Sequence, residues 1–209
     1  MRVDISPEEL GPKDFYRFLT SVIIPRPIAW VSTVSADGVL NLAPHSFFTV
    51  ASTDPPVVQF TPTARKDSLN NAESTGEFVV NFAPEELFAE INGTGTNFPP
   101  EVNEFDAVGL GTEPSLTVRP PRVAESPVAL ECRVHEIIPV GNSWLVLGRV
   151  LHAAINEEMM DGDHPEATRL KPLARLGRNE WSRLGEIVRI DRIPYRDWPK
   201  DQLPRRDRG

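Results

Sequence analysis

The chain has 209 residues, 40% of them hydrophobic, which is enough for one domain with its own core. Its 30 acidic residues outnumber the 22 basic ones, and the formal charge of −8 argues against a nucleic-acid or anionic-membrane surface. The only cysteine, Cys132, excludes an intrachain disulfide and a cysteine metal site, and we expect it to be a small strand residue in a reducing compartment.

Short apolar runs separated by turn residues dominate the first part of the chain. Ile28 to Val34 is rich in Ile, Val, Trp and Thr and predicts a strand, while Pro25 and Pro27 place the segment before it at an edge or a bend. Asp37-Gly38 predicts a hairpin turn after that strand. The other strands predicted here are Val39 to Leu42, Pro56 to Thr61 and Glu77 to Phe82.

Two short helices are predicted between and after these strands. Asp67 to Ser74 should be helical, because Asp67 or Ser68 can cap its start and Thr75-Gly76 can end it. Ala83 to Ile91 has a proline and two glutamates in its first turn, where both are favourable. Gly93 to Gly111 carries Gly, Asn and two adjacent prolines, which predicts an irregular surface segment.

The second half of the chain is dominated by one long hairpin. Val128 to Ile138 and Trp144 to Asn156 predict two strands joined by a turn at residues 140–143. Pro172 to Gly177 should be a loop or helical turn, and Glu186 to Ile193 a last short strand. Six or more strands with only short helices predict an antiparallel barrel with helical decorations.

We expect a single domain over residues 1–209, with peripheral tails at 1–14 and 196–209. The basic run Arg205 to Arg208 is interpreted as part of a solvated tail, so no nucleic-acid partner is expected. No apolar stretch reaches the ~20 residues that span a bilayer, and the first residues lack the apolar segment of a signal peptide. The expected location is therefore cytoplasmic, without a membrane partner.

The segment Arg65 to Ser68 places two cations and a hydroxyl at the predicted start of a helix. A helix start presents unpaired N–H groups, so a phosphate would gain from both the amides and the cations. The same residues allow a plainer interpretation, in which Asp67 caps the helix while Arg65 and Lys66 lie in water. Both interpretations stay open on these residues alone.

Hydroxyl and aromatic side chains meet in Ser46 to Thr49, at the expected end of a strand. A flat heteroaromatic ring could be held there by backbone N–H groups and apolar flanks, but a core-packed pair of phenylalanines explains the residues equally well. In the preceding strand, alternation places Trp30 and Ser32 on one face and Val31 and Thr33 on the other. A tryptophan in the barrel wall is the plainer interpretation of Trp30.

The four histidines, His45, His135, His152 and His164, show no metal-ligand spacing, so we predict no metal. His45 and His164 lie beside loops and are the better candidates for site contacts. No Gly-x-Ser-x-Gly motif is present, which argues against a serine hydrolase.

Several short segments occur in an order and at spacings that are specific when taken together. They are Arg26 to Thr33, Asn41 to Phe48, Asp54-Pro55-Pro56, Arg65 to Ser68, Thr75 to Asn81, Asn103 to Asp106, Gly109-Leu110, Ser126 to Cys132 and Leu173 to Gly177. From about Phe15 to Ile193 the chain thus resembles the flavin reductase-like, FMN-binding split-barrel family. The resemblance is strongest to its branch of flavoredoxin and of the reductase partners of two-component monooxygenases.

The resemblance implies a mainly β fold, a six-stranded antiparallel Greek-key split β-barrel with a few short helices. It also implies a homodimer with flavin mononucleotide (FMN) at or near its interface. The implied FMN-binding residues are Trp30, Ser32, Thr33, Ser46, Phe47, Phe48 and Thr49 around the ring, and Arg65, Lys66, Asp67 and Ser68 around the phosphate. Trp144, His164 and Trp181 are weaker candidates, with His164 expected to assist the chemistry and Trp181 standing where the branch often has tyrosine.

The implied function is that of an NAD(P)H:flavin oxidoreductase. FMN would pass a hydride or electrons from NADH or NADPH to an acceptor, and a monooxygenase is the expected partner protein. An FMN-binding electron carrier or flavin store without turnover of its own fits the same residues. A β-barrel interaction module without a cofactor is a third interpretation.

Overall fold

The structure is a computed structural model that describes residues 1–198. The helices are α1 (Pro7–Val22), α2 (Asp67–Thr75), α3 (Phe88–Gly93), α4 (Glu104–Val108) and α5 (Ala167–Leu170), with 3-10 turns at Glu85–Leu87, Glu157–Met159 and Tyr195–Asp197. The longer strands are β2 (Ala29–Val34), β3 (Leu40–His45), β4 (Phe48–Thr53), β5 (Pro56–Phe60), β6 (Glu77–Asn81), β9 (Val128–Val140) and β10 (Ser143–Ile155). The two-residue strands are β1 (Arg26–Pro27), β7 (Thr112–Glu113), β8 (Arg122–Val123), β11 (Met160–Asp161), β12 (His164–Pro165), β13 (Ala174–Arg175) and β14 (Trp181–Ser182).

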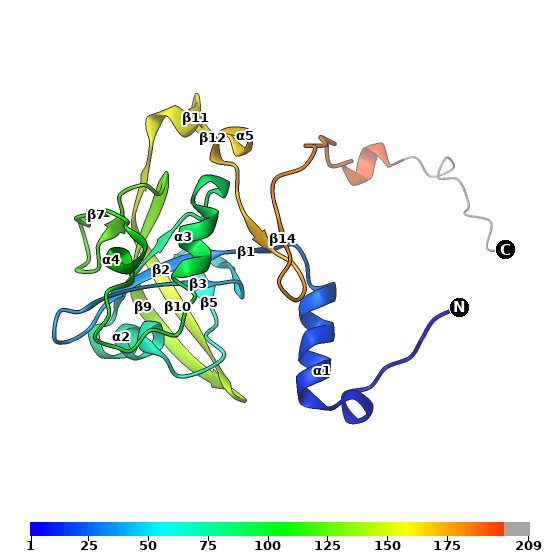
Figure 1. Cartoon of the computed structure of the whole chain (residues 1–209). Coiled ribbons are helices and arrows are strands. Elements are labelled where there is room, and N and C mark those ends of the chain that lie inside the picture. The colour runs from blue at the N-terminus through cyan, green and yellow to red at the C-terminus, as the bar shows by residue number, and fades with distance from the viewer. Residues whose placement is uncertain (199–209) are drawn as a thin grey trace.

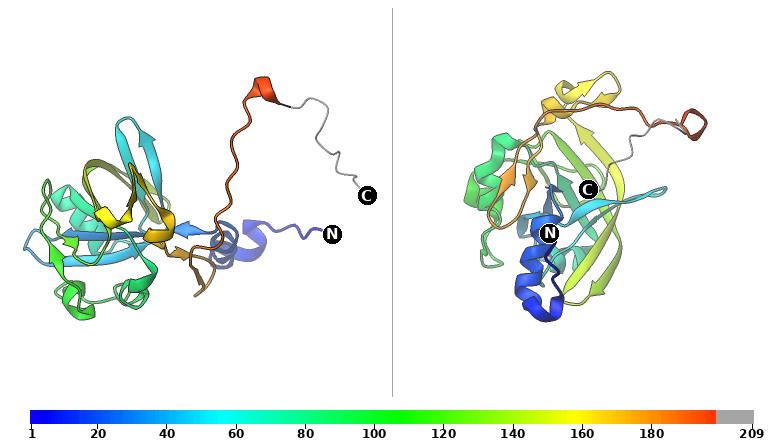
Figure 2. Two further views of the ribbon diagram at one scale, coloured as in Figure 1. Left: turned by 90° about the horizontal axis from the view of Figure 1, so that it is seen from above. Right: turned by 90° about the vertical axis from the view of Figure 1, so that its right-hand side faces the viewer.

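Seven antiparallel strands form the main sheet, in the order β3-β2-β6-β9-β10-β5-β4. Within residues 1–198 no ladder joins its outer strands β3 and β4, although only Ser46 and Phe47 separate them in the chain. Such a link spans only about 10 Å, so the sheet must curl until the end of β3 comes close to the start of β4. The result is a curled sheet, split between β3 and β4, which are not paired with each other; Figure 2 shows the molecule from two further directions.

Two hydrophobic clusters cover the two faces of β2, whose six residues are all buried. Val31 belongs to the cluster that contains Phe60 and Phe78, and α2 packs Leu69 against it. Trp30 points the other way, into the cluster formed with α3 and α4, and its Nε1 donates a hydrogen bond to Thr94 Oγ1 (2.9 Å). The predicted alternation of Trp30 and Val31 is thus confirmed, and both faces of the strand are core.

Helix α1 stands beside the barrel, joined to it by the small β1-β13-β14 sheet (Figure 1). A capping box between Ser6 and Glu9 starts the helix, and Gly11 kinks it with a φ of 73°. The buried Arg26 holds its end, because Nη1 donates to the carbonyls of Thr20 and Ile23 and Nη2 to that of Leu176. One buried side chain of β1 therefore connects the end of α1 to the β1-β13-β14 sheet.

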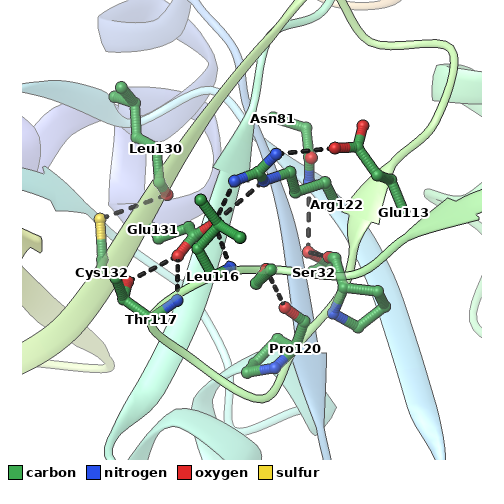
Figure 3. Close-up of polar contacts among 12 residues, drawn as sticks. Ser32, Asn81, Glu113, Leu116, Thr117, Pro120, Arg122, Leu130, Glu131 and Cys132 are labelled. Atoms are coloured by element: carbon green, nitrogen blue, oxygen red, sulfur yellow. Dashed lines mark hydrogen bonds and ion pairs between the residues drawn. The ribbon is translucent and has the colours of Figure 1, made fainter. Parts of the chain in front are cut away.

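A buried ion pair fixes the loop between β7 and β8 (Figure 3). Glu131 of β9 is fully buried and accepts hydrogen bonds from the amides of Leu116 (2.9 Å) and Thr117 (2.6 Å). Arg122 donates to the same carboxylate through Nε (2.9 Å) and Nη2 (2.6 Å), and through Nη1 to Glu113 (2.7 Å). This network holds the loop against the centre of the main sheet.

Several predicted elements are corrected. Ala83 to Ile91 is not one helix but a 3-10 turn followed by α3, and the irregular segment Gly93 to Gly111 contains α4, capped by Asn103 and ended by the left-handed Gly109. No strand forms over Glu186 to Ile193, because these described residues pair with no other segment. No helix was predicted near the start of the chain, where α1 begins at a capping box.

Pro172 to Gly177, expected to be a loop or helical turn, contains β13, and β4 was not predicted. The other strand and helix predictions agree with the structure to within a few residues, and the main sheet has seven strands where six were expected. Cys132 is buried on β9. Burial, and to a smaller extent the negative charge of Glu131, raises the pKa of its thiol to about 12, which suits a packed thiol.

Within residues 1–198 no helix is both long and apolar enough to cross a membrane. The single-domain organisation and the cytoplasmic location stay predictions, and the run Arg205 to Arg208 lies outside the described residues.

Candidate functional site

A cavity of about 550 Å³, here called the split cavity, lies where the barrel is open. One wall is the end of β3 and its link to β4, residues 43–47, and the opposite wall is the segment 61–70 that leads into α2. Residues 94–98 after α3 and Tyr16 of α1 form further parts of the lining, together with Asn41, Pro100 and Glu104. Segments far apart in the sequence therefore meet around the link between β3 and β4.

The start of α2 gives the split cavity its positive side. Lys66 is the N-cap residue, its extended backbone carries no side-chain cap, and Asp67 is the first helical residue. The interpretation that Asp67 merely caps the helix is therefore wrong. Arg65 lies over the ring of Trp144 (5.4 Å) and pairs with Glu73 (2.6 Å), while Lys66 Nζ donates to Asn97 Oδ1 (2.5 Å). Two tethered cations thus flank amides that an anion can bind.

His45 contributes an unsatisfied polar atom to the wall. Its Nε2 is buried and has no hydrogen-bond partner within the described part of the chain. Burial, with the charge of Lys66 second, lowers the pKa of His45 to about 4, so the ring is neutral at pH 7. Buried polar atoms seldom lack a partner, and His45 is one of the residues that line the split cavity.

A buried amide network fixes the floor beneath the α2 start. Asn41 donates to Thr33 Oγ1 (3.0 Å) and to Ser68 Oγ (3.1 Å), and Asn71 donates to Thr33 Oγ1 (3.1 Å). Of these residues Asn41 and Ser68 line the cavity, whereas Thr33 lies behind them. Burial raises the pKa of Glu104, a second acid of the lining beside Asp67, even though its carboxylate accepts from the amide of Leu42 (3.0 Å).

The residues expected around a ring are divided by the structure. Ser46 and Phe47 line the split cavity, and Tyr16 packs against Phe47 with ring centroids 6.4 Å apart. Phe48 packs against the barrel core, and Thr49 is exposed on β4. Neither is part of the lining.

Trp30 and Ser32 also lie outside the lining. Trp30 is fully buried, and Ser32 donates to the carbonyl of Pro121 (2.6 Å), so both act in the core. His164 is exposed on β12, in a separate hairpin, and lines neither cavity. Trp144 reaches the split cavity only through its contact with Arg65.

A second cavity of about 390 Å³ adjoins the first, and we call it the arginine cavity. Four arginines line it: Arg17, Arg26, Arg175 and Arg178. It shares Tyr16, Pro44, Ser46 and Gly95 with the split cavity. Trp181 forms part of its wall and stacks under the guanidinium of Arg175 at 4.6 Å.

Sequence reasoning missed most of this second cavity. Arg26 and Arg175 lie in segments that resemble the family, and Trp181 lies just after one of them. No pattern in the neighbouring sequence indicates that the three residues meet. Tyr16 and Asn41 were missed as well, because long-range packing of α1 and β3 brings them to the split. Within residues 1–198 no group of three or more His, Cys, Asp or Glu is arranged to hold a metal ion.

Comparison with known proteins identifies the family. The model of the flavin reductase-like domain matches residues 21–173. A protein of Aquifex aeolicus, itself uncharacterised, is 39% identical over 176 residues, which are 81% of this chain and 90% of that protein.

Solved structures agree in fold. Nitrilotriacetate monooxygenase component B from Bacillus cereus is 34% identical, with a TM-score of 0.89 over 91% of this chain and 99% of its own. A split-barrel protein of Shewanella frigidimarina shares only 18% identity but superposes with a TM-score of 0.82, over 92% of this chain and 100% of its own. The predicted split-barrel fold is thus confirmed.

Proposed function

The chain belongs to the flavin reductase-like family, and from that premise we propose that it binds FMN in the split cavity and passes electrons from NADH or NADPH to an acceptor. One observation carries the proposal. The uncapped, cationic start of α2 and the neutral, buried His45 line the same 550 Å³ cavity. A flavin nucleotide has a phosphate that suits the start of α2 and a heteroaromatic ring with polar edges that suits the side of the cavity formed by His45.

The residues of the cavity fit this cofactor in kind. Arg65, Lys66 and the first amides of α2 would hold the phosphate, and Ser46, Phe47 and the neutral His45 would border the ring. Bound FMN would supply the redox chemistry, accepting two electrons and a proton from a dihydronicotinamide. The chain's own task is then to bind, orient and shield, and no side chain has to act as acid or base.

A homodimer is part of the proposal. Five apolar residues are exposed along the end of α1, which also carries Tyr16 of both cavity linings, and just after it: Phe18, Leu19, Val22, Ile23 and Ile24. Clustered exposed apolar side chains of this kind mark an interaction surface. A second copy of the chain covering this surface would also narrow the entrance to the flavin.

A monooxygenase that uses the reduced flavin is the proposed partner protein, as the relationship to component B of nitrilotriacetate monooxygenase suggests.

Loss of both cations at the α2 start should separate FMN from riboflavin. Charge-assisted hydrogen bonds contribute about 1.5–3 kcal/mol each, less when exposed, so Arg65→Ala with Lys66→Ala should weaken FMN binding about 10- to 100-fold. Riboflavin, which lacks the phosphate, should bind almost as before. Flavin fluorescence quenching measures both affinities, and Arg149→Ala with Lys171→Ala is a control of equal charge outside the cavity. Equal losses for both ligands would contradict the phosphate assignment.

Reduction of bound FMN distinguishes an oxidoreductase from a carrier. Stopped-flow mixing of the FMN-loaded protein with NADH or NADPH should bleach the flavin absorbance near 450 nm on the timescale of turnover, roughly 1–1000 s⁻¹. A flavin that stays oxidised with both nucleotides, yet is reduced by dithionite, would instead indicate an electron carrier or flavin store.

A further inference from the structure

The arginine cavity is a concentration of positive charge in an acidic protein. The chain carries a formal charge of −8, yet four arginines and, among the described residues, no Asp or Glu line this cavity. One of the four, Arg17, pairs with the exposed Asp14 on the surface of α1 (2.8 Å). A cavity of this composition attracts an anion.

Two of these cations are held close together by the backbone. Arg26 and Arg175 are register partners in the antiparallel β1-β13 pair. Like charges directly opposite one another destabilise a strand pair unless a counter-charge lies between them. Arg26 donates through Nη1 and Nη2 to three backbone carbonyls and through Nε to Ser46 Oγ (3.4 Å), so its role is structural.

Arg175 and Arg178 are the cations placed to meet a ligand. Arg175 is half-buried, supported from below by Trp181, and donates one hydrogen bond to the carbonyl of Arg178 (2.7 Å). Arg178 is exposed at the tip of the same turn with a φ of 51°, a left-handed conformation that is rare for a residue with a side chain. Such backbone strain is found at sites that bind ligands more often than elsewhere.

The position of the arginine cavity beside the split cavity indicates what kind of anionic molecule it would bind. It adjoins the split cavity along Tyr16, Ser46 and Gly95, so a molecule with its reactive ring against a flavin could extend its other end between the arginines. In NADH and NADPH a single ribose separates the nicotinamide from the pyrophosphate. Arg guanidinium groups are well suited to bidentate contacts with phosphate.

We propose that the arginine cavity binds the phosphate groups of the dinucleotide that reduces the flavin, with Arg175 and Arg178 as the contacting residues. The inference rests on the proposed function and adds to it a site for the electron donor. The anion is supplied either by the pyrophosphate, common to NADH and NADPH, or by the 2′-phosphate of NADPH.

The test compares charged and uncharged electron donors on the FMN-loaded protein. Arg175→Gln with Arg178→Gln should raise the apparent Kd of NADH, NADPH or both at least about 10-fold in stopped-flow reduction. Reduction by 1-benzyl-1,4-dihydronicotinamide, which has no phosphate, should be unchanged. Equal increases for NADH and NADPH would assign the pyrophosphate, and an increase confined to NADPH the 2′-phosphate. When Arg178→Lys, which keeps the charge, replaces Arg178→Gln in the double variant, part of the dinucleotide affinity should return.

Controls separate this inference from the proposed function. Arg133→Gln with Arg149→Gln removes the same charge from exposed positions outside both cavities and should leave every Kd unchanged. Dinucleotide affinities like those of this control, or an equal loss with the uncharged donor, would overturn the inference while FMN reduction itself still stands. If none of the three donors reduces the wild-type flavin, the proposed function fails and the donor site with it.

Discussion

Replacing Glu131 with alanine should lower the free energy of unfolding by about 3–5 kcal/mol, because it leaves Arg122 as a buried charge without its main partner. The carboxylate is fully buried, and the side chain of Arg122 is only 8% exposed. The amides of Leu116 and Thr117 would lose their acceptor as well. Glu113 remains as a partner of Arg122 but is half-exposed and offers weaker compensation.

Urea unfolding followed by circular dichroism measures this loss. Glu136 lies exposed on the same strand, so Glu136→Ala is the matched control and should change stability by less than about 0.5 kcal/mol. Glu131→Gln keeps the shape but not the charge and should fall between the two. A loss for Glu131→Ala no larger than that of the control would show that the network in Figure 3 adds nothing to stability.

The same carboxylate makes stability depend on pH. Burial alone would raise the pKa of Glu131, but hydrogen bonds from Thr117, Leu116 and Arg122 outweigh it and hold the pKa at about 2, below the ordinary 4.5. A folded pKa below the unfolded one means that the contribution is complete above about pH 4.5 and disappears as pH falls towards 2. Wild-type stability should therefore fall more steeply over this range than that of Glu131→Gln.

Most of the longer strands were predictable because their signals are local, whereas β4 was not predicted. Asp37-Gly38 and the turn at residues 140–143 join runs of β-branched residues, and those hairpins form at the expected places. Helix α1 was missed although Ser6 and Glu9 form a capping box, since prolines and a glycine interrupt its pattern. The failed strand at Glu186 to Ile193 has suitable residues but no neighbouring strand to pair with.

The candidate site was predictable only where it is contiguous in the sequence. Arg65 to Ser68 and Ser46-Phe47 line the split cavity as expected, because each segment is a short stretch at the end of an element. Trp30 carries a large aromatic ring suited to a flavin, but the sequence does not reveal that helices cover the outer face of β2. The arginine cavity depends on the β1-β13 pairing, which joins residues about 150 positions apart.

Gly148→Ala should destabilise the barrel by about 3 kcal/mol or more, because the space for a side chain at this position is already filled. A Cβ atom there would lie 2.1 Å from Cζ of Phe78, 2.7 Å from its Cε1 and 3.1 Å from Cβ of Cys132. Phe78 is fully buried and packs edge-on against Phe60 with ring centroids 5.1 Å apart, so it cannot move aside without opening the core. Overpacking a rigid core costs about 1–3 kcal/mol, and a contact this short belongs at or beyond the top of that range.

Phe78→Leu in the same chain tests this steric cause. Phe78→Leu alone should destabilise the protein. The stability loss of the double variant Gly148→Ala/Phe78→Leu should nevertheless be smaller than the sum of the two single-variant losses, by about 1 kcal/mol or more in a double-mutant cycle. Gly185→Ala is the matched control, since a Cβ atom there would meet nothing within 4 Å. Additive losses for Gly148→Ala and Phe78→Leu would mean that the alanine is accommodated by backbone movement at the β9–β10 bulge, where the register shifts between Leu147 and Gly148, and not opposed by the Phe78 ring.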